Sequence, residues 1–153
     1  MEALSERVYS VLDYHDGPIR GLADYGGRPQ LYQAIFSVVD DEWVASTYEL
    51  SPVSDELFAL AMESWSIWLR FDAALRSGAV LRPADISDWG ALTDELPRRR
   101  ALQTLLDEHL TIDAAERVLI RGEFRAVQAA QPIPLDSLTI SQQPLEVCWQ
   151  RLE

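Results

Sequence analysis

Four short segments rich in apolar residues, separated by turn signals, fill the first fifty residues of the chain. The four segments cover residues 7–14, 19–25, 31–39 and 43–50. The turn signals between them are Asp16-Gly17-Pro18, Gly26-Gly27 and Asp40-Asp41-Glu42. Glycine supplies the positive φ that a tight turn needs, and such short connections join antiparallel neighbours. The pattern therefore predicts a four-stranded antiparallel meander.

The segment that follows has the pattern of a buried helix. Ser54 is a favourable N-cap residue, and two acidic residues behind it complement the positive end of the helix dipole. Glu63 and Arg70 lie on one narrow polar stripe, and apolar side chains cover nearly all the remaining surface up to residue 75. A helix with so wide an apolar arc is buried on more than one side. We expect a long central helix laid across the sheet.

The second half of the chain predicts fewer elements. Residues 79–96 have the composition of a loop, residues 98–110 carry a leucine stripe typical of a second, shorter helix, and residues 117–127 and 145–152 have strand patterns. Gly122 marks a possible bulge in the first of these strands. The predicted fold class is α+β. It consists of an antiparallel sheet of five or six strands, the N-terminal meander plus the C-terminal strands, and two helices, within a single domain over residues 1–153.

Charge and cysteine content exclude several classes of function. The 153 residues include 25 acidic and 13 basic ones, giving a net charge of −12, which should repel nucleic-acid phosphates. Cys148 is the sole cysteine, so no internal disulfide can form, which suits a reducing compartment. We find no signal-peptide pattern, and charged residues interrupt the longest apolar stretch, so we expect no membrane span and a cytoplasmic location.

Three segments carry a resemblance. Residues 13–25, residues 63–68 and residues 121–125 are similar to parts of a loosely defined set of small uncharacterised bacterial proteins. The resemblance spans most of the chain. It implies a bacterial source, and it transfers no functional residue to this sequence.

Catalytic and metal-binding patterns are sparse. Asp13, His15 and Asp16 crowd one turn and have ligand types that divalent metals use, but turn chemistry alone explains them. Cys148 with His15 or His109 would supply a nucleophile and a base, although a buried, inert thiol is commoner in a strand. We find no glycine-rich phosphate-binding loop, because no predicted helix begins directly after the glycines. We therefore predict no catalytic residue, no bound metal and no cofactor.

A row of arginines suggests a possible anion site. Arg117, Arg121 and Arg125 recur at a spacing of four, which places them on one face of a straight strand. Such a row can bind a carboxylate or phosphate, or it can pair with acidic residues across the sheet. With Glu63 and Arg70 it would line a ligand pocket between the sheet and the central helix.

Two tryptophans next to acidic residues suggest a surface for a partner. Trp43 follows an acidic turn, and Trp89 lies between aspartates, so we expect both to be partly exposed. Exposed tryptophans within a polar rim are typical of binding hot spots. The residues of this candidate surface are Asp40, Asp41, Glu42, Trp43, Asp85, Asp88 and Trp89.

Three hypotheses for function follow. The first is a protein-binding module, an inhibitor or immunity-type protein whose acidic face recognises a basic surface on another protein. The second is a small-molecule enzyme or ligand-binding domain with the pocket described above. The third is a mimic of nucleic acid, for which the sequence offers no long regular acidic array.

Overall fold

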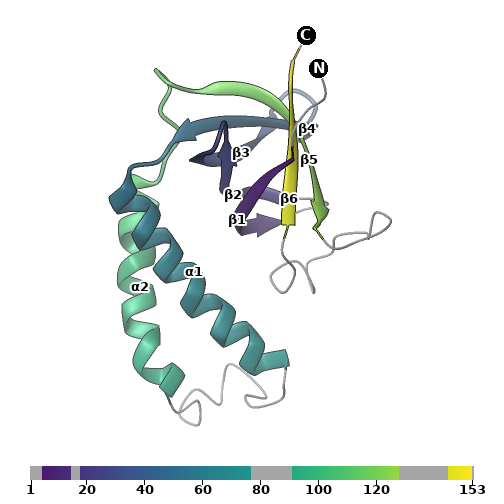
Figure 1. Ribbon diagram of the computed structural model, residues 1–153. Coiled ribbons are helices and arrows are strands. Elements are labelled where there is room, and N and C mark those ends of the chain that lie inside the picture. The colour runs from purple at the N-terminus through teal and green to yellow at the C-terminus, as the bar shows by residue number, and fades with distance from the viewer. Residues whose placement is uncertain (1–4, 15–17, 77–90, 128–144, 153) are drawn as a thin grey trace. The chain divides into compact units, whose positions relative to one another are not determined.

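Six strands and two helices make up the described part of the chain. The computed structural model describes residues 5–14, 18–76, 91–127 and 145–152. In chain order the elements are β1 (Ser5–Tyr14), β2 (Pro18–Tyr25), β3 (Arg28–Ser37), β4 (Glu42–Pro52), α1 (Asp55–Arg76), α2 (Ala91–His109), β5 (Val118–Ala126) and β6 (Leu145–Arg151) (Figure 1). The predicted α+β class, with six antiparallel strands and two helices, is confirmed. The helices form one compact unit and the strands another.

The strands form a closed antiparallel barrel in chain order. Each strand pairs with the next, as the meander predicts, and β1 also pairs with β6, with Ser5 opposite Cys148 and Val8 opposite Leu145. This last pairing closes the sheet into a barrel, a feature that the predicted sheet did not specify. Closure removes the free outer edges that an open six-stranded sheet would leave at its two ends.

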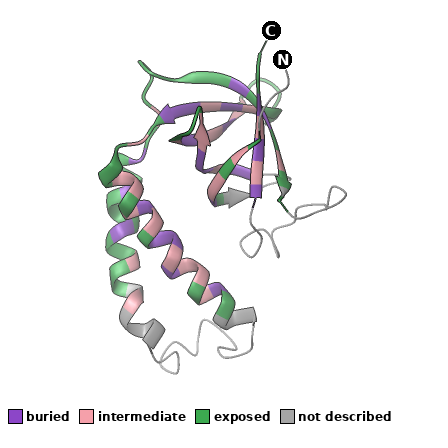
Figure 2. Ribbon diagram, viewed as in Figure 1, coloured by how far each residue is buried: buried purple, intermediate pink, exposed green. Residues whose placement is uncertain are grey.

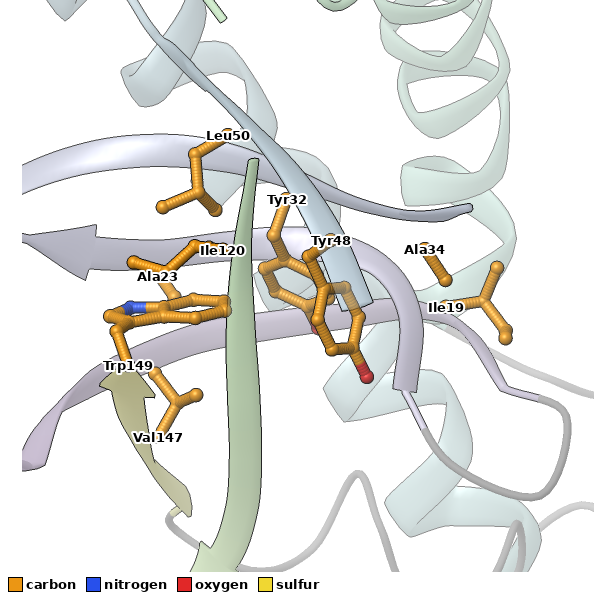
Figure 3. Packing of buried hydrophobic residues seen from close by; sticks show 9 residues of the cluster. All are labelled: Ile19, Ala23, Tyr32, Ala34, Tyr48, Leu50, Ile120, Val147 and Trp149. Carbon is orange, nitrogen blue, oxygen red and sulfur yellow. The ribbon is translucent and has the colours of Figure 1, made fainter. Parts of the chain in front are cut away.

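The barrel interior is filled by its own side chains. Buried residues recur along the strands of the barrel (Figure 2). Among the described residues, the buried cluster of the barrel draws on strands alone, and Tyr32, Tyr48 and Trp149 dominate it (Figure 3). These rings and the partly buried Phe124 contact one another, with centroids 5.0 to 6.4 Å apart. Edge-to-face and tilted aromatic contacts add stabilisation beyond the area they bury. The barrel therefore builds this core from the side chains of its own strands.

The polar groups of the three large rings in this core are paired with backbone carbonyls. The Tyr32 hydroxyl donates to the Ser10 carbonyl at 2.9 Å, and the Tyr48 hydroxyl donates to the Pro18 carbonyl at 2.7 Å. The indole N–H of Trp149 donates to the Asp24 carbonyl at 2.8 Å. Each bond satisfies a donor that would otherwise be costly to bury. The three bonds fix the orientation of the large rings.

Burial also shifts the titration of the tyrosines, which predicts an alkaline weakness. Burial raises the pKa of Tyr48 from 10.0 to about 12. As pH rises, Tyr48 loses its proton at a lower pH in the unfolded chain than in the folded chain. Its contribution to the free energy of unfolding is therefore fully present below pH 10 and is lost towards pH 12. The loss is about 1.4 kcal/mol per pH unit for each proton released. In Tyr48→Phe the free energy of unfolding should fall less steeply with pH, by the equivalent of about one proton. Urea unfolding from pH 9 to 12 measures this slope. Equal slopes in the two proteins would contradict this assignment.

Two glycines lie where the barrel has no room for a side chain. A Cβ on Gly122 would meet the ring of Trp149, and a Cβ on Gly21 would meet the Ser10 carbonyl and the Tyr32 hydroxyl. The pairing of β5 with β6 continues in regular register through Gly122. The predicted bulge at Gly122 is therefore wrong, and this glycine instead makes space for the indole.

The helical unit begins as the sequence predicts. The Leu57 N–H donates to the Ser54 hydroxyl at 3.2 Å, which confirms Ser54 as the N-cap of α1. Its buried side chains include Ala61, Trp65 and Ile67. Leu102 and Leu106 of α2 are buried as expected, whereas Leu105 is exposed.

The second helix begins earlier than predicted. It starts at Ala91 and contains Pro97, so the loop predicted through residue 96 is wrong for residues 91–96. Two pairs of bidentate hydrogen bonds join the helices on either side of the proline. Arg98 donates to Glu63 at 2.7 and 3.0 Å, and Arg70 donates to Glu95 at 2.6 and 3.1 Å. These contacts help to hold a helix that proline alone would disfavour.

The early start also changes the position of the arginines at residues 98–100, which would open the predicted helix over residues 98–110. They lie in the middle of α2 and not in its first turn, so the unfavourable end of the helix dipole does not act on them. Neither of the described helices combines the length and apolar character needed to cross a membrane.

Candidate binding site at the β3–β4 turn

The turn between β3 and β4 brings apolar and acidic side chains to one surface. Ser37 closes it, since its hydroxyl donates to the Asp40 carboxylate at 3.1 Å and accepts the Asp40 N–H at 3.2 Å. Asp41 has a φ of 54°, in the left-handed region that the backbone of residues other than glycine seldom adopts. β3 ends at Ser37, so the predicted strand through residue 39 is two residues too long. The hydrogen bonds of Ser37 turn the chain before Val38 and Val39 can pair.

Apolar residues around this turn are unusually exposed. Val38 and Val39 are 86% and 95% exposed, although β-branched side chains favour a half-buried sheet surface. Phe36 and Trp43 lie opposite each other on the two strands and pack edge to face, with centroids 5.1 Å apart. They remain 43% and 36% exposed, which confirms the prediction for Trp43. Contiguous exposed apolar side chains within a polar rim mark interaction surfaces.

A large bulge, with four residues against one, shapes the first half of β4. Trp43 is opposite Phe36 and Tyr48 is opposite Ala34, so residues 44–47 of β4 face Ile35 alone on β3. Ser46 within this bulge has a φ of 56°. Pairing of β4 with β5 covers residues 47–50 and 118–121, and residues 42–46 lie beyond it. Bulges of this kind redirect a strand and its side chains, and they recur beside functional sites.

The bulge borders a hollow of about 430 Å³ that opens to the surface. We call it the hairpin hollow, and its lining residues are Pro18, Ile19, Ala34, Phe36, Asp41, Glu42, Trp43, Val44, Ala45, Ser46 and Tyr48. Ile19, Ala34 and Tyr48 are buried and also belong to the barrel core. In Figure 3, Ile19 and Ala34 lie on the far side of Tyr48 from Trp149. The hollow thus connects the exposed turn to the packed interior.

The turn beside the hollow is acidic. Residues 36–48 include Asp40, Asp41 and Glu42 and no basic residue. All three acidic residues are exposed. This arrangement offers aromatic rings, aliphatic surface and hydrogen-bond acceptors to a ligand or partner. It suits a cationic group better than an anion.

The predicted arginine row pairs across the sheet. Arg117 donates to Glu49 at 2.7 Å, and Arg125 donates to Glu146 and to Ser5 at 2.5 and 2.6 Å. Arg121 is exposed and lies opposite Thr47 and Gln150. Two of the three guanidinium groups therefore already have acidic partners. Of the two alternatives that the sequence left open, anion binding and pairing across the sheet, these two arginines follow the second.

Glu63 and Arg70, the other members of the predicted ligand pocket, pair within the helical unit. Each is exposed and forms its ion pair with α2, and Arg70 also donates to Ser66 at 2.8 Å. Hydrogen bonding to Arg98 lowers the pKa of Glu63, which keeps this carboxylate ionised. In these contacts the two side chains connect one helix to the other.

The remaining candidates do not meet in the described structure. Asp13 lies in β1 opposite Arg20, while His15 and Asp16 fall outside the described residues, as do Asp85, Asp88 and Trp89. Cys148 is half-buried in β6 opposite Glu123, and His109 is exposed at the end of α2. Within the described ranges, no three residues of metal-ligand type gather into a possible site.

Sequence reasoning missed most of the hollow. The alternation pattern predicts a strand through Phe36, Val38 and Val39, although an apolar pair directly before two aspartates is also a signal of an exposed turn. Ile19 and Ser46 carry no local signal, because only the barrel brings the start of β2 beside the bulge of β4.

No protein-family model, curated protein or solved structure gives a significant match to this chain.

Proposed function

We propose that this chain is a protein-binding module that recognises a basic surface of another protein, as an inhibitor or immunity-type protein does. The observation that carries this proposal is the β3–β4 turn, where five exposed apolar residues adjoin three carboxylates. The apolar residues are Phe36, Val38, Val39, Trp43 and Val44. Exposing valines and aromatic rings without covering them is unfavourable, so a function in binding accounts for them.

The composition of this surface resembles that of an interface centre with a charged rim. Trp43 and Phe36 supply large, rigid contact area, which is the usual source of hot-spot affinity. Asp40, Asp41 and Glu42 supply negative charge that speeds association with a basic partner and rejects acidic ones. The charge of −12 on the whole chain acts in the same direction at longer range.

Affinity capture with matched variants tests the proposal. The tagged protein is incubated at low ionic strength with lysate of the cell from which the sequence comes, and retained proteins are quantified by mass spectrometry. We expect a basic protein that the wild type and Leu119→Ala both retain, since Leu119 is exposed on β5 outside the surface. Trp43→Ala should weaken its binding by about 2 kcal/mol or more, which is typical of a hot spot.

Charge neutralisation provides the second arm of the test. The triple variant Asp40→Asn, Asp41→Asn, Glu42→Gln should lower the association rate, and added salt should lower it for the wild type as well. The proposal is wrong if every retained protein binds Trp43→Ala and the triple variant with the same affinity as it binds the wild type. Circular dichroism of each variant confirms that it is folded.

The hollow also supports a second candidate, a domain that binds a small molecule. A volume of about 430 Å³ is within the range of ligand pockets, roughly 300–1,000 Å³. The hollow is open to the surface and its rim continues into the exposed valines, which favours a protein as the occupant.

A further inference from the structure

We propose that the hairpin hollow is a cation-binding site that receives the side chain of a lysine or arginine from the partner protein. This inference rests on the proposed function and names the chemical group at the centre of the contact. It draws on the walls of the hollow, its charge, and the backbone that shapes it.

The walls of the hollow match the two ends of a long basic side chain. Ile19, Ala34 and Tyr48 provide a buried apolar floor, against which an aliphatic stem can pack. Phe36 and Trp43 form the aromatic wall and are both partly exposed. The electron-rich faces of such rings attract ammonium and guanidinium groups.

Charge selects a cation over an anion or a neutral ligand. Asp41 and Glu42 are the charged residues of the lining, and no basic side chain is among the residues that line it. The Tyr48 hydroxyl already donates to the Pro18 carbonyl, so it does not offer its proton to a ligand. The Asp41 and Glu42 carboxylates offer acceptors, which an ammonium or guanidinium group satisfies with several donors.

The backbone around the hollow is held in an unfavourable conformation. Asp41 and Ser46 both line the hollow and both have positive φ values, 54° and 56°. Strained backbone of this kind persists where the surrounding structure enforces it, and it clusters at ligand-binding sites. Here the two strained residues lie on either side of Trp43 in the chain, within the lining of the hollow.

The position of the hollow favours a side chain over a free amine. Val38 and Val39 lie in the turn between Phe36 and Asp41, two lining residues, and are almost fully exposed. A bound lysine would therefore place its own backbone and neighbours near further apolar surface. A free amine would leave these two valines uncovered. The binding of one basic side chain would thus anchor a larger protein contact.

Carbodiimide coupling tests the site, because the chain contains no lysine. The probe is lysine blocked as its Nα-acetyl N-methylamide, which carries one amine. The carbodiimide converts a carboxylate to an O-acylisourea, and the amine of a nearby probe displaces the urea to form an amide. We expect coupling at Asp41 or Glu42 about tenfold above that at Glu116, an exposed carboxylate outside the hollow, from the affinity that aromatic walls add. Peptide mapping by mass spectrometry measures the ratio.

Two further measurements separate a specific site from general acidity. Blocked arginine, which does not couple, should compete with the lysine probe, whereas blocked norleucine, which has the apolar stem without the charge, should not. Trp43→Ala keeps both carboxylates and should reduce the coupling preference by about three- to tenfold, because the aromatic wall is lost. Equal coupling at Glu116 and Glu42 in the wild type would overturn the proposal, as would full competition by norleucine.

The source of the cation is tested with n-butylammonium. If it couples at the hollow and blocked lysine does not, the assignment to a protein side chain is wrong and the site binds free amines. If neither couples while affinity capture still depends on Trp43, the cation site is refuted and the protein-binding function stands. If capture fails and blocked lysine couples as expected, the cation site is supported and the protein-binding function falls.

Discussion

Trp149→Ala is expected to lower the free energy of unfolding by about 3–5 kcal/mol, because truncating a buried tryptophan removes its contacts and leaves a cavity. Trp149 is 6% exposed and its ring touches those of Tyr32, Tyr48 and Phe124. The variant also leaves the Asp24 carbonyl without the indole N–H. Chemical denaturation followed by circular dichroism measures the loss.

Trp43→Ala is the matched control for this prediction. It removes the same side chain from a position that is 36% exposed, and we expect a loss of about 1 kcal/mol or less. Similar losses for the two variants would contradict the assignment of Trp149 to the core.

Gly122 gives the same prediction a second test. Gly122→Ala alone should cost about 1–3 kcal/mol, since its Cβ would overlap the Trp149 ring. In the Trp149→Ala background the same substitution has room, so the two effects should not add. Simple additivity would show that the glycine is not there to accommodate the indole.

Gly21→Ala is expected to cost about 3 kcal/mol or more, at the upper end of the effects of overpacking. Its Cβ would meet the Ser10 carbonyl and the Tyr32 hydroxyl, two atoms that are hydrogen-bonded to each other at 2.9 Å. One is backbone and the other belongs to a completely buried side chain, so neither can move without breaking the bond. Thermal and urea unfolding measure the effect.

Gly27→Ala is the control for this substitution. Gly27 has a φ of 77°, and a Cβ added there would have no neighbouring atom within 4 Å. Alanine at this position therefore meets only conformational strain, about 1–2 kcal/mol. A Gly21→Ala variant no less stable than Gly27→Ala would show that the β1–β2 pairing is looser than described.

Local patterns predicted the elements well and their assembly poorly. Alternation and turn glycines located all six strands, and Ser54 marked the start of α1 correctly. The pairing of β1 with β6 joins residues as far apart as Ser5 and Cys148, and no local pattern specifies such a contact. The start of α2 was predicted too late because residues 79–96 have the composition of a loop, whereas ion pairs with α1 support the helix on both sides of Pro97.

The candidate site was predicted in part for the same reason. Trp43 and its acidic neighbours are adjacent in the sequence, so composition alone brought them together. The floor of the hollow comes from β2, β3 and β4, and its shape depends on the bulge at Ser46, which no propensity indicates. The arginine row was ambiguous because the choice between binding and pairing depends on which acidic residues lie opposite.

The connection between β4 and β5 has a consequence for how the chain could change. The Asp113 N–H donates to the Ser51 hydroxyl at 2.9 Å, so the chain leaves and re-enters the barrel at neighbouring points. The entropy cost of closing a loop grows slowly with its length. Segments of quite different size could therefore be exchanged at this point over evolutionary time, or by an engineer, while the strand order and the hairpin hollow stay as they are.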